Sequence, residues 1–242
     1  MAKTIEFVKH YQAHIGSIAA FVISPDEKML VTTGASDQMI KFFEISGFDM
    51  SNMISVEYQP FCACWIPSVG SSNRLCNRVA VADQNSGNIR IYRISGDQQA
   101  MATLDLHSSP VKCMALNFAA QAVVSIDSRG VIEYWDCQTL QLPPTRKAGQ
   151  RDTAGITFTL KTDTDLYDLA KARASPLALS IAPKGDFFAV LSSDMMVRIF
   201  NFARGKLSRK YDESVAANVQ SMSGSGPGAS GGACCCCCCC CC

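Results

Sequence analysis

Residues Gln121 to Asp136 read Q-A-V-V-S-I-D-S-R-G-V-I-E-Y-W-D, and the interpretation of the whole chain depends on this stretch. A short apolar run, Ala122 to Val124, is followed by a polar turn, Ser125 to Gly130, and by a second apolar run that ends in Trp135 and Asp136. Two β-type runs joined by a glycine-containing turn predict a β-hairpin. If the pattern recurs at a fixed period, this hairpin is one unit of a repeat.

Four such units can be aligned, each reading strand, turn, strand, turn, strand. Each has an aspartate in the turn that precedes an apolar strand, and these residues are Asp37, Asp83, Asp127 and Asp194. Their first two intervals, 46 and 44 residues, agree with the period of WD40 repeats, and the third, 67 residues, contains an insertion. We therefore expect an all-β fold, a partial WD40 β-propeller of about four blades with one short helical insertion and a disordered tail.

The predicted domains follow from these units. The propeller fragment covers residues 1–215, with blades around 14–58, 61–105, 107–160 and 174–213. Residues 216–242 are predicted to be a disordered Gly/Ser linker and a poly-Cys tail, Cys234 to Cys242. Simple-sequence DNA read in the wrong frame is the favoured origin of that tail, and a metal or redox tail is the alternative.

An arc of four blades would leave two exposed edge strands, near Ile5–Val8 and Lys206–Tyr211. We therefore expect the isolated chain to be weakly stable, self-associating or chaperone-dependent. Compact closure of four blades is the alternative, at the low end of propeller sizes.

The turn aspartates are predicted to anchor hydrogen-bond networks inside the blades. His14 is expected to pair with Asp37, and His107 with Asp127, while the indole N–H of Trp135 closes the network of the third blade. Asp194 is the corresponding residue of the fourth blade. A metal or acid–base site is the alternative reading, but these residues belong to separate repeats. No catalytic, cofactor-binding or metal-binding residue is therefore predicted.

The turn lengths differ between the repeats. Asp37 and Asp194 precede a strand aromatic residue by six positions, the common WD40 spacing, whereas Asp127 precedes Trp135 by eight and Asp83 precedes Tyr92 by nine. The networks of the two middle repeats are therefore expected to differ from the usual pattern.

The insertion after Asp136 is predicted to have three parts. Its basic loop, with Arg146, Lys147 and Arg151, is interpreted as solvated, with contact to RNA or an acidic partner as the alternative. Phe158–Leu160 is a possible short strand. Thr164–Lys171 is a predicted helix with Asp163 or Thr164 as N-cap, either a docking element or a cover for a blade edge.

Composition excludes several classes of protein. The chain has 242 residues and a formal net charge of +1, so bulk charge does not favour a nucleic-acid partner. The N-terminus has no secretory pattern, and no apolar run is long enough to span a membrane. Cysteines outside the tail are predicted to be reduced, mostly buried thiols in a reducing intracellular compartment, and they are Cys62, Cys64, Cys76, Cys113 and Cys137. Their spacing does not favour zinc.

The connecting segments carry a more specific signal than the blades. They include Phe7–His14, Gly47–Ile54, Ile132–Trp135, Lys161–Pro176, Val197–Phe200, Gly205–Leu207 and Tyr211–Ser214. Together they resemble the WD40 domain of cyclophilin-type peptidyl-prolyl isomerases that contain WD repeats. The resemblance implies an N-terminal propeller, a linker and a C-terminal isomerase domain, in a nuclear protein associated with the spliceosome and mRNA splicing.

The chain has no Phe-His-Arg or Gln-Gly-Gly-Asp run of the kind found in cyclophilin catalytic segments. We therefore expect a truncated piece without the isomerase domain, which acts as a protein–protein interaction scaffold and not as an enzyme. It should bind proteins of a spliceosomal or other nuclear complex, and no nucleic acid, membrane, small-molecule substrate or cofactor. The alternatives are that the parent protein acts as a prolyl isomerase, or that the propeller binds histone or chromatin peptides.

Overall fold

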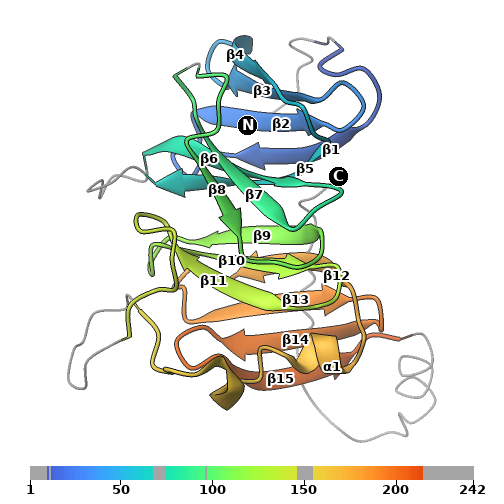
Figure 1. Ribbon diagram of the computed structural model, residues 1–242, viewed down its shortest axis with the longest axis vertical. Coiled ribbons are helices and arrows are strands. Elements are labelled where there is room, and N and C mark those ends of the chain that lie inside the picture. The colour runs from blue at the N-terminus through green and yellow to red at the C-terminus, as the bar shows by residue number, and fades with distance from the viewer. Residues whose placement is uncertain (1–9, 11, 68–74, 96, 146–154, 215–242) are drawn as a thin grey trace, which may run out of the picture.

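A computed structural model of the chain describes residue 10 and residues 12–67, 75–95, 97–145 and 155–214. Within these residues the fold is all-β, with fifteen strands in four antiparallel sheets (Figure 1). The predicted fold class is thereby confirmed. Ile5–Val8, the basic loop Arg146–Arg151 and the cysteine tail lie outside the described residues.

Each sheet is one blade, and its strands follow one another in chain order. The first blade contains β1 (Ile18–Ile23), β2 (Met29–Gly34), β3 (Met39–Glu44) and β4 (Asp49–Ser55). The second contains β5 (Pro60–Pro67), β6 (Cys76–Asp83), β7 (Asn88–Arg93) and β8 (Ala102–Asp105). The third contains β9 (Val111–Asn117), β10 (Ala122–Asp127) and β11 (Ile132–Asp136). The fourth contains β12 (Pro176–Ile181), β13 (Phe187–Ser192), β14 (Met196–Asn201) and β15 (Lys206–Asp212).

The hairpin predicted from Gln121 to Asp136 is confirmed. β10 and β11 pair antiparallel from Ala122 opposite Asp136 to Ile126 opposite Ile132. All six residues of β10 are buried, because its sheet is covered on both faces by neighbouring blades.

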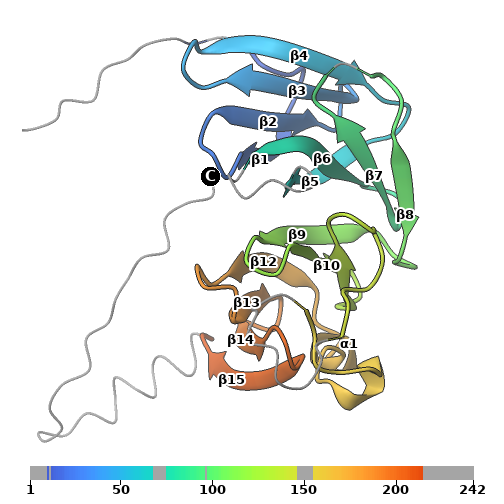
Figure 2. The same ribbon diagram turned by 90° about the vertical axis from the view of Figure 1, so that its left-hand side faces the viewer.

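The blades stack through their first strands. β1, β5, β9 and β12 lie side by side in chain order (Figures 1 and 2). Three apolar clusters fill the junctions. The first and second blades share the cluster around Phe42 and Trp65, the second and third share the one around Trp135, and the third and fourth share the one around Tyr134.

The four sheets form an open arc and do not close on themselves, so the compact four-bladed alternative is wrong. Burial in the fourth blade shows why. On β13, Phe188 and Val190 are buried in the third junction. The residues that alternate with them, Phe187, Ala189 and Leu191, are exposed or half-buried. One face of this blade therefore has no neighbouring blade among the described residues.

The insertion differs from the prediction in two ways. The expected helix Thr164–Lys171 is wrong in extent, because only Asp168–Lys171 (α1) is α-helical and a 3₁₀ turn, η1 (Lys161–Asp163), precedes it. The residues between them are held by the fourth blade instead. The amide of Asp165 donates to the Gly205 carbonyl at 2.8 Å, and its carboxylate accepts the amide of Leu207 at 2.9 Å. These tertiary bonds compete with the helical pattern.

The capping prediction is also wrong. Tyr167 is the N-cap of α1, and neither α1 nor η1 has a side-chain cap. The expected strand Phe158–Leu160 is wrong, because these residues have no strand conformation. The preceding residue, Thr157, donates its amide to the carbonyl of Ala203 in the fourth blade at 2.8 Å. The apolar side chain of Phe158 nevertheless joins the third junction. Within the described part of the chain, no helix is long and apolar enough to span a membrane.

Candidate functional site

The first blade brings His14 and Asp37 together as expected. His14 Nδ1 lies 2.9 Å from Asp37 Oδ2, and His14 Nε2 lies 2.8 Å from Thr32 Oγ1. Asp37 also accepts the backbone amides of Ile15 at 3.1 Å and Met39 at 3.3 Å. Burial alone would raise the pKa of Asp37, but the hydrogen bonds from Ile15 and His14 outweigh it and the pKa is lowered. The ionised carboxylate thus fixes the loop before β1 to the turn after β2.

The third blade repeats this arrangement with a weaker contact. His107 Nε2 lies 2.8 Å from Ser125 Oγ, but His107 Nδ1 is 3.6 Å from Asp127 Oδ2, beyond hydrogen-bond distance. Asp127 Oδ1 accepts the amides of Arg129 at 3.0 Å and Val131 at 2.9 Å. Asp127 is the last residue of β10, whereas Asp37 follows the end of β2 by three residues, so the longer turn places the carboxylate less favourably.

Trp135 does not take the role that the sequence predicted. Its indole Nε1 is buried without a hydrogen-bond partner, so the expectation that it closes the third network is wrong. The ring lies in the apolar second junction, in a cluster with side chains such as Ala80 and Val123, which carry no acceptor. Ser125 contacts His107 and lies 3.5 Å from the carbonyl of Glu133 instead.

In the second blade the turn aspartate is contacted by an arginine of the third strand, Arg90 on β7. Asp83 accepts the amide of Asn85 at 2.9 Å and the hydroxyl of Ser86 at 2.8 Å, which closes its turn. Arg90 Nη1 lies 3.6 Å from Asp83 Oδ2, and its guanidinium carbon lies 4.0 Å from the ring centre of Tyr58. Sequence reasoning did not identify Arg90 or Tyr58, both of which contribute to this end of the blade.

The fourth blade has the most extensive network, built on Arg198. This side chain is completely buried and donates to both oxygens of Asp194, at 3.0 and 2.6 Å, and to Ser192 Oγ at 2.5 Å. Its Nε also donates to Asp168 Oδ2 at 2.7 Å, which ties α1 to the blade. The hydrogen bonds from Arg198 hold the pKa of Asp194 well below its usual range.

The sequence contained signals for the partners that were missed. Thr32 follows His14 by 18 residues, and Ser125 follows His107 by the same interval. Arg198 is a charged residue in an apolar strand, four positions after Asp194. Because a buried charge needs a partner of opposite charge, an arginine in an apolar strand predicts a nearby carboxylate.

These networks lie at one end of every blade, which we call the aspartate face. It consists of the loops before each first strand and the turns between each second and third strand. Exposed apolar side chains on its loops are Ile15, Leu106 and Met195, and exposed basic ones are Arg129, Lys171 and Arg173. α1 belongs to this face, because Gly130 packs so closely against Leu169 and Ala174 that a Cβ there would lie 2.8 Å from both.

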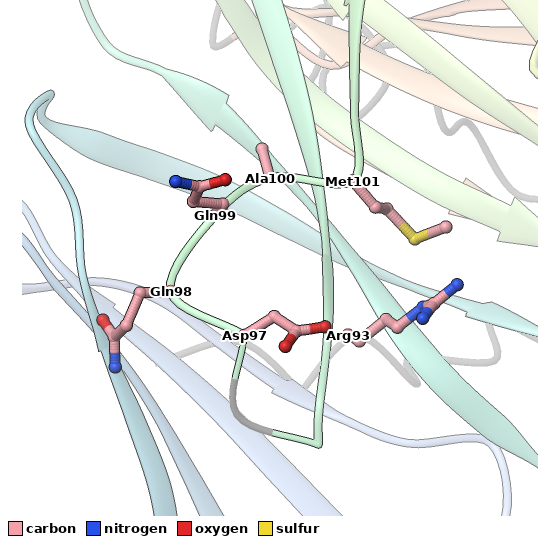
Figure 3. A pocket seen from close by; sticks show the side chains of 6 residues that line it. All are labelled: Arg93, Asp97, Gln98, Gln99, Ala100 and Met101. Atoms are coloured by element: carbon pink, nitrogen blue, oxygen red, sulfur yellow. The ribbon is translucent and has the colours of Figure 1, made fainter.

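A hollow of about 360 Å³ lies beside the loop between β7 and β8 (Figure 3). Its lining residues are Arg93, Asp97, Gln98, Gln99, Ala100 and Met101. Gln98 is already engaged with the first blade, since its amide nitrogen donates to the Met53 carbonyl at 3.3 Å and its oxygen accepts the Ser55 amide at 3.1 Å. Gln98 therefore helps to hold the second blade against the first.

The thiols and acidic groups of the described residues lie apart from one another as possible metal ligands. Among the described residues no group of three or more histidine, cysteine, aspartate or glutamate side chains is placed to hold a metal ion. The five described cysteines are free thiols, and burial raises the pKa of Cys113 to about 11 and that of Cys76 to about 12. A protonated thiol is a poor nucleophile, so these side chains act as packing groups.

Comparison with known proteins agrees with the repeats. Residues 5–44 match the family model "WD domain, G-beta repeat". The chain is 39% identical over 228 residues to "Peptidyl-prolyl cis-trans isomerase cyp15" of Rhizopus delemar, covering 93% of this chain and 34% of that protein. It is 38% identical over 213 residues to human "Peptidylprolyl isomerase domain and WD repeat-containing protein 1", covering 88% of this chain and 31% of that protein.

A more distant relative, "Peptidyl-prolyl cis-trans isomerase 9" of Schizosaccharomyces pombe, is 29% identical over 87% of this chain and 33% of its own length. The chain thus spans about a third of the curated relatives it matches. The repeat match, the blades and these similarities together show that the chain is a WD40-repeat region, of the kind found in relatives named as peptidyl-prolyl isomerases with WD repeats.

Proposed function

We propose that this chain is a protein–protein interaction scaffold that holds a nuclear, splicing-associated peptidyl-prolyl isomerase against its partners. The observation that carries the proposal is the similarity over 93% of the chain to a protein named as an isomerase, in a region that folds as WD40 blades. Propellers bind peptides and subunits through the loops at the ends of their blades, which is an argument from the fold.

The aspartate face is the proposed binding surface. Its networks hold the loops rigid, so that exposed groups on them are presented in fixed positions. The exposed basic residues Arg129, Lys171 and Arg173 lie on the turn after β10 and at the end of α1, and α1 packs against that turn at Gly130. Acidic protein segments would bind there. This favours a protein partner with an acidic recognition segment.

A charge-reversal experiment tests the surface. The variant with Arg129→Glu, Lys171→Glu and Arg173→Glu should lose partners that the tagged parent chain recovers from nuclear extract. A matched control reverses three exposed charges at the opposite end of the blades, Lys28, Lys184 and Arg204, and should keep them. Equal loss in both variants would contradict an aspartate-face site.

The identity of the recovered proteins tests the biological setting. Spliceosomal proteins in the crosslinked and sequenced fraction would support the proposal, together with nuclear fluorescence of a tagged chain. Recovery of histones without splicing proteins would favour the alternative, a reader of chromatin peptides.

We further propose that this chain contributes binding and no catalysis. Its relatives are named as isomerases, but the described residues form packed blades, without a group of histidine, cysteine, aspartate or glutamate side chains placed to hold a metal ion. A proline-isomerisation assay on a short Xaa-Pro peptide should give the uncatalysed rate, and clear acceleration would overturn this part of the proposal.

A further inference from the structure

Three exposed basic side chains surround the contact between the β10–β11 turn and the segment that contains α1. Gly130 of the turn packs so closely on this segment that a Cβ there would lie 2.8 Å from the carbonyl oxygen of Ala174. Arg129 precedes Gly130 and Arg173 precedes Ala174, so the two arginines start from adjoining stretches of backbone. Lys171, the last residue of α1, is the third. We call these three basic residues the basic cluster.

The positive charge of the basic cluster is not neutralised by the described acidic residues. Within the part of the chain that the structure describes, none of its three side chains forms an ion pair. The carboxylates of this region are engaged elsewhere, since Asp168 and Asp194 bind Arg198 at 2.7 and 2.6 Å. Asp127 is buried inside its own turn. The cluster therefore offers its charges to an external anion.

The distribution of these charges indicates the kind of anion that fits. Other lysines around α1 are paired within the chain, Lys161 with Glu133 and Lys206 with Asp165 at 3.5 Å. The uncompensated charges are therefore concentrated in one place and do not form a stripe along the face. An acidic segment spreads single charges over successive residues, whereas a phosphorylated side chain carries about 1.5 to 2 negative charges and three strong acceptor oxygens on one group.

The residue types also favour a phosphate group. Guanidinium groups present planar sets of donors that match phosphate oxygens, and hydrogen bonds between ionised groups are about twice as strong as neutral ones. We propose that the basic cluster binds a phosphorylated serine or threonine of a protein partner, with Arg129 and Arg173 as donors to the phosphate oxygens and Lys171 as the third positive charge. This inference rests on the proposed function, because it names the chemistry of the segment that binds the aspartate face.

A nucleic-acid backbone is less well matched to the same charges. Proteins that bind single strands combine a basic groove with aromatic side chains on which the bases stack. The exposed apolar side chains on the loops of the aspartate face are aliphatic, and they are Ile15, Leu106 and Met195. A formal net charge of +1 adds no long-range attraction for a polyanion.

The backbone at Arg173 gives an independent reason to assign its side chain a role in binding. Its φ is 54°, in the left-handed region that favours glycine, and it directly follows Ala172, the C-cap of α1. An exposed arginine thus occupies a position where glycine is less strained. Replacement by glycine removes the cation without adding strain, so a loss of binding in that variant is not explained by unfolding.

The test uses peptide libraries on the immobilised full chain in reducing buffer. One library has a central phosphoserine or phosphothreonine between degenerate positions, and its twins have serine or glutamate at the centre. We expect the phosphorylated library to be retained about tenfold better than the serine library and about threefold better than the glutamate library, because the dianion has more charge and more acceptor oxygens.

The failures of the two proposals can be told apart. Equal retention of the phosphorylated and glutamate libraries, both above serine, would overturn the phosphate assignment and leave the acidic-segment proposal standing. Equal retention of all three libraries would also overturn the inference, and the pull-down with the charge-reversed variant then decides the proposed function by itself.

Variants locate the site. Arg173→Gly and Arg129→Gln should each lower retention of the phosphorylated library about tenfold, through loss of a charge-assisted contact. Arg173→Gly should do so without lowering the urea midpoint, because relief of the left-handed strain offsets the greater chain entropy of glycine. Unchanged retention in Arg173→Gly would overturn the inference.

The matched control is Glu27→Gly. Glu27 is also exposed and charged, with a φ of 60°, but it lies on the turn between β1 and β2 at the opposite end of the blades. Its replacement should affect the urea midpoint in the same way and leave retention at the parent level. An equal loss of retention in Glu27→Gly would show that the effect is not local to the basic cluster and would overturn the inference.

Competition with a mixed-sequence single-stranded RNA completes the experiment. RNA should leave retention of the phosphorylated library unchanged. If RNA displaces that library, and binds the parent chain but not Arg173→Gly, the basic cluster is a nucleic-acid contact and the inference is overturned.

Discussion

Replacing Arg198 with methionine tests whether the fourth blade depends on its buried charge. The substitution keeps an unbranched side chain but removes four hydrogen bonds, to Asp194, Ser192 and Asp168. Removing one partner of a buried ion pair costs about 3–5 kcal/mol, because the remaining charge is left uncompensated. Both carboxylates are 31% exposed and can recover some hydration, so we expect the lower end, ~3 kcal/mol.

That loss is large for a single residue. It is a substantial part of the ~5–15 kcal/mol that stabilises an ordinary protein, and at ~2–4 °C per kcal/mol it lowers the melting temperature by about 6–12 °C. Arg198→Lys keeps the charge but not the planar fork that binds Asp194 through both oxygens, and should lie between the parent and the methionine variant.

Urea denaturation in reducing buffer, followed by tryptophan fluorescence at one fixed protein concentration, measures the effect. Arg204→Met is the control, since Arg204 is exposed on the turn after β14 and its replacement should change stability by no more than ~0.5 kcal/mol.

A double-mutant cycle with Asp194→Asn isolates the pair. If the ion pair matters, the two losses are non-additive by ~1–3 kcal/mol. A loss below ~0.5 kcal/mol for Arg198→Met, or additivity in the cycle, would refute the reasoning.

Three other outcomes concern the remaining networks. Trp65→Phe should destabilise the fold by ~2 kcal/mol, because the carbonyl of Val22 loses its indole donor at 2.9 Å. Trp135→Phe should cost less than ~1 kcal/mol, because it removes an indole N–H that has no partner. Circular dichroism in urea ranks the two variants, and the reverse order would contradict the assignment. The pKa values of Asp37 and Asp194 are lowered in the fold, so the stability they contribute is fully present above pH ~4 and is lost as the pH falls through the folded pKa values. Asp194→Asn should therefore show a smaller loss of urea midpoint between pH 6 and 2.5 than the parent, and equal losses would exclude this carboxylate as a source of acid sensitivity. Leu169→Ala should cost ~3 kcal/mol, since the side chain that seats α1 is fully buried, and a change below ~1 kcal/mol by thermal denaturation would show that the helix is not docked there.

The repeat pattern predicted the fold well because the strands that pair within a blade are close in sequence. Its strands follow one another in sequence, so the hairpin from Ala122 to Asp136 and its counterparts could be recognised without knowledge of distant contacts. The insertion was predicted less well for the opposite reason. Asp165 and Thr157 form hydrogen bonds with backbone groups of the fourth blade that lie about 40 residues later in the sequence. Such long-range bonds cannot be predicted from a local sequence pattern.

The aspartate networks lie between these extremes. His14 and Asp37 meet because the usual turn length sets their geometry, whereas the longer turn at Asp127 leaves its carboxylate 3.6 Å from His107. The sequence spacing of eight residues between Asp127 and Trp135 indicated an unusual network but could not show that the indole faces an apolar junction. Side-chain direction depends on which neighbouring blade covers each face.

The strands of the third and fourth blades show the same dependence on neighbouring blades. A strand that is apolar at successive positions is typical of a sheet covered on both faces. β10 satisfies the pattern, with Val123 in the second junction and Val124 in the third. β13 has the same apolar succession, but Phe188 is buried while Phe187 is not. The apolar succession of β13 thus predicts two covered faces, and the described blades cover the one that carries Phe188 and Val190.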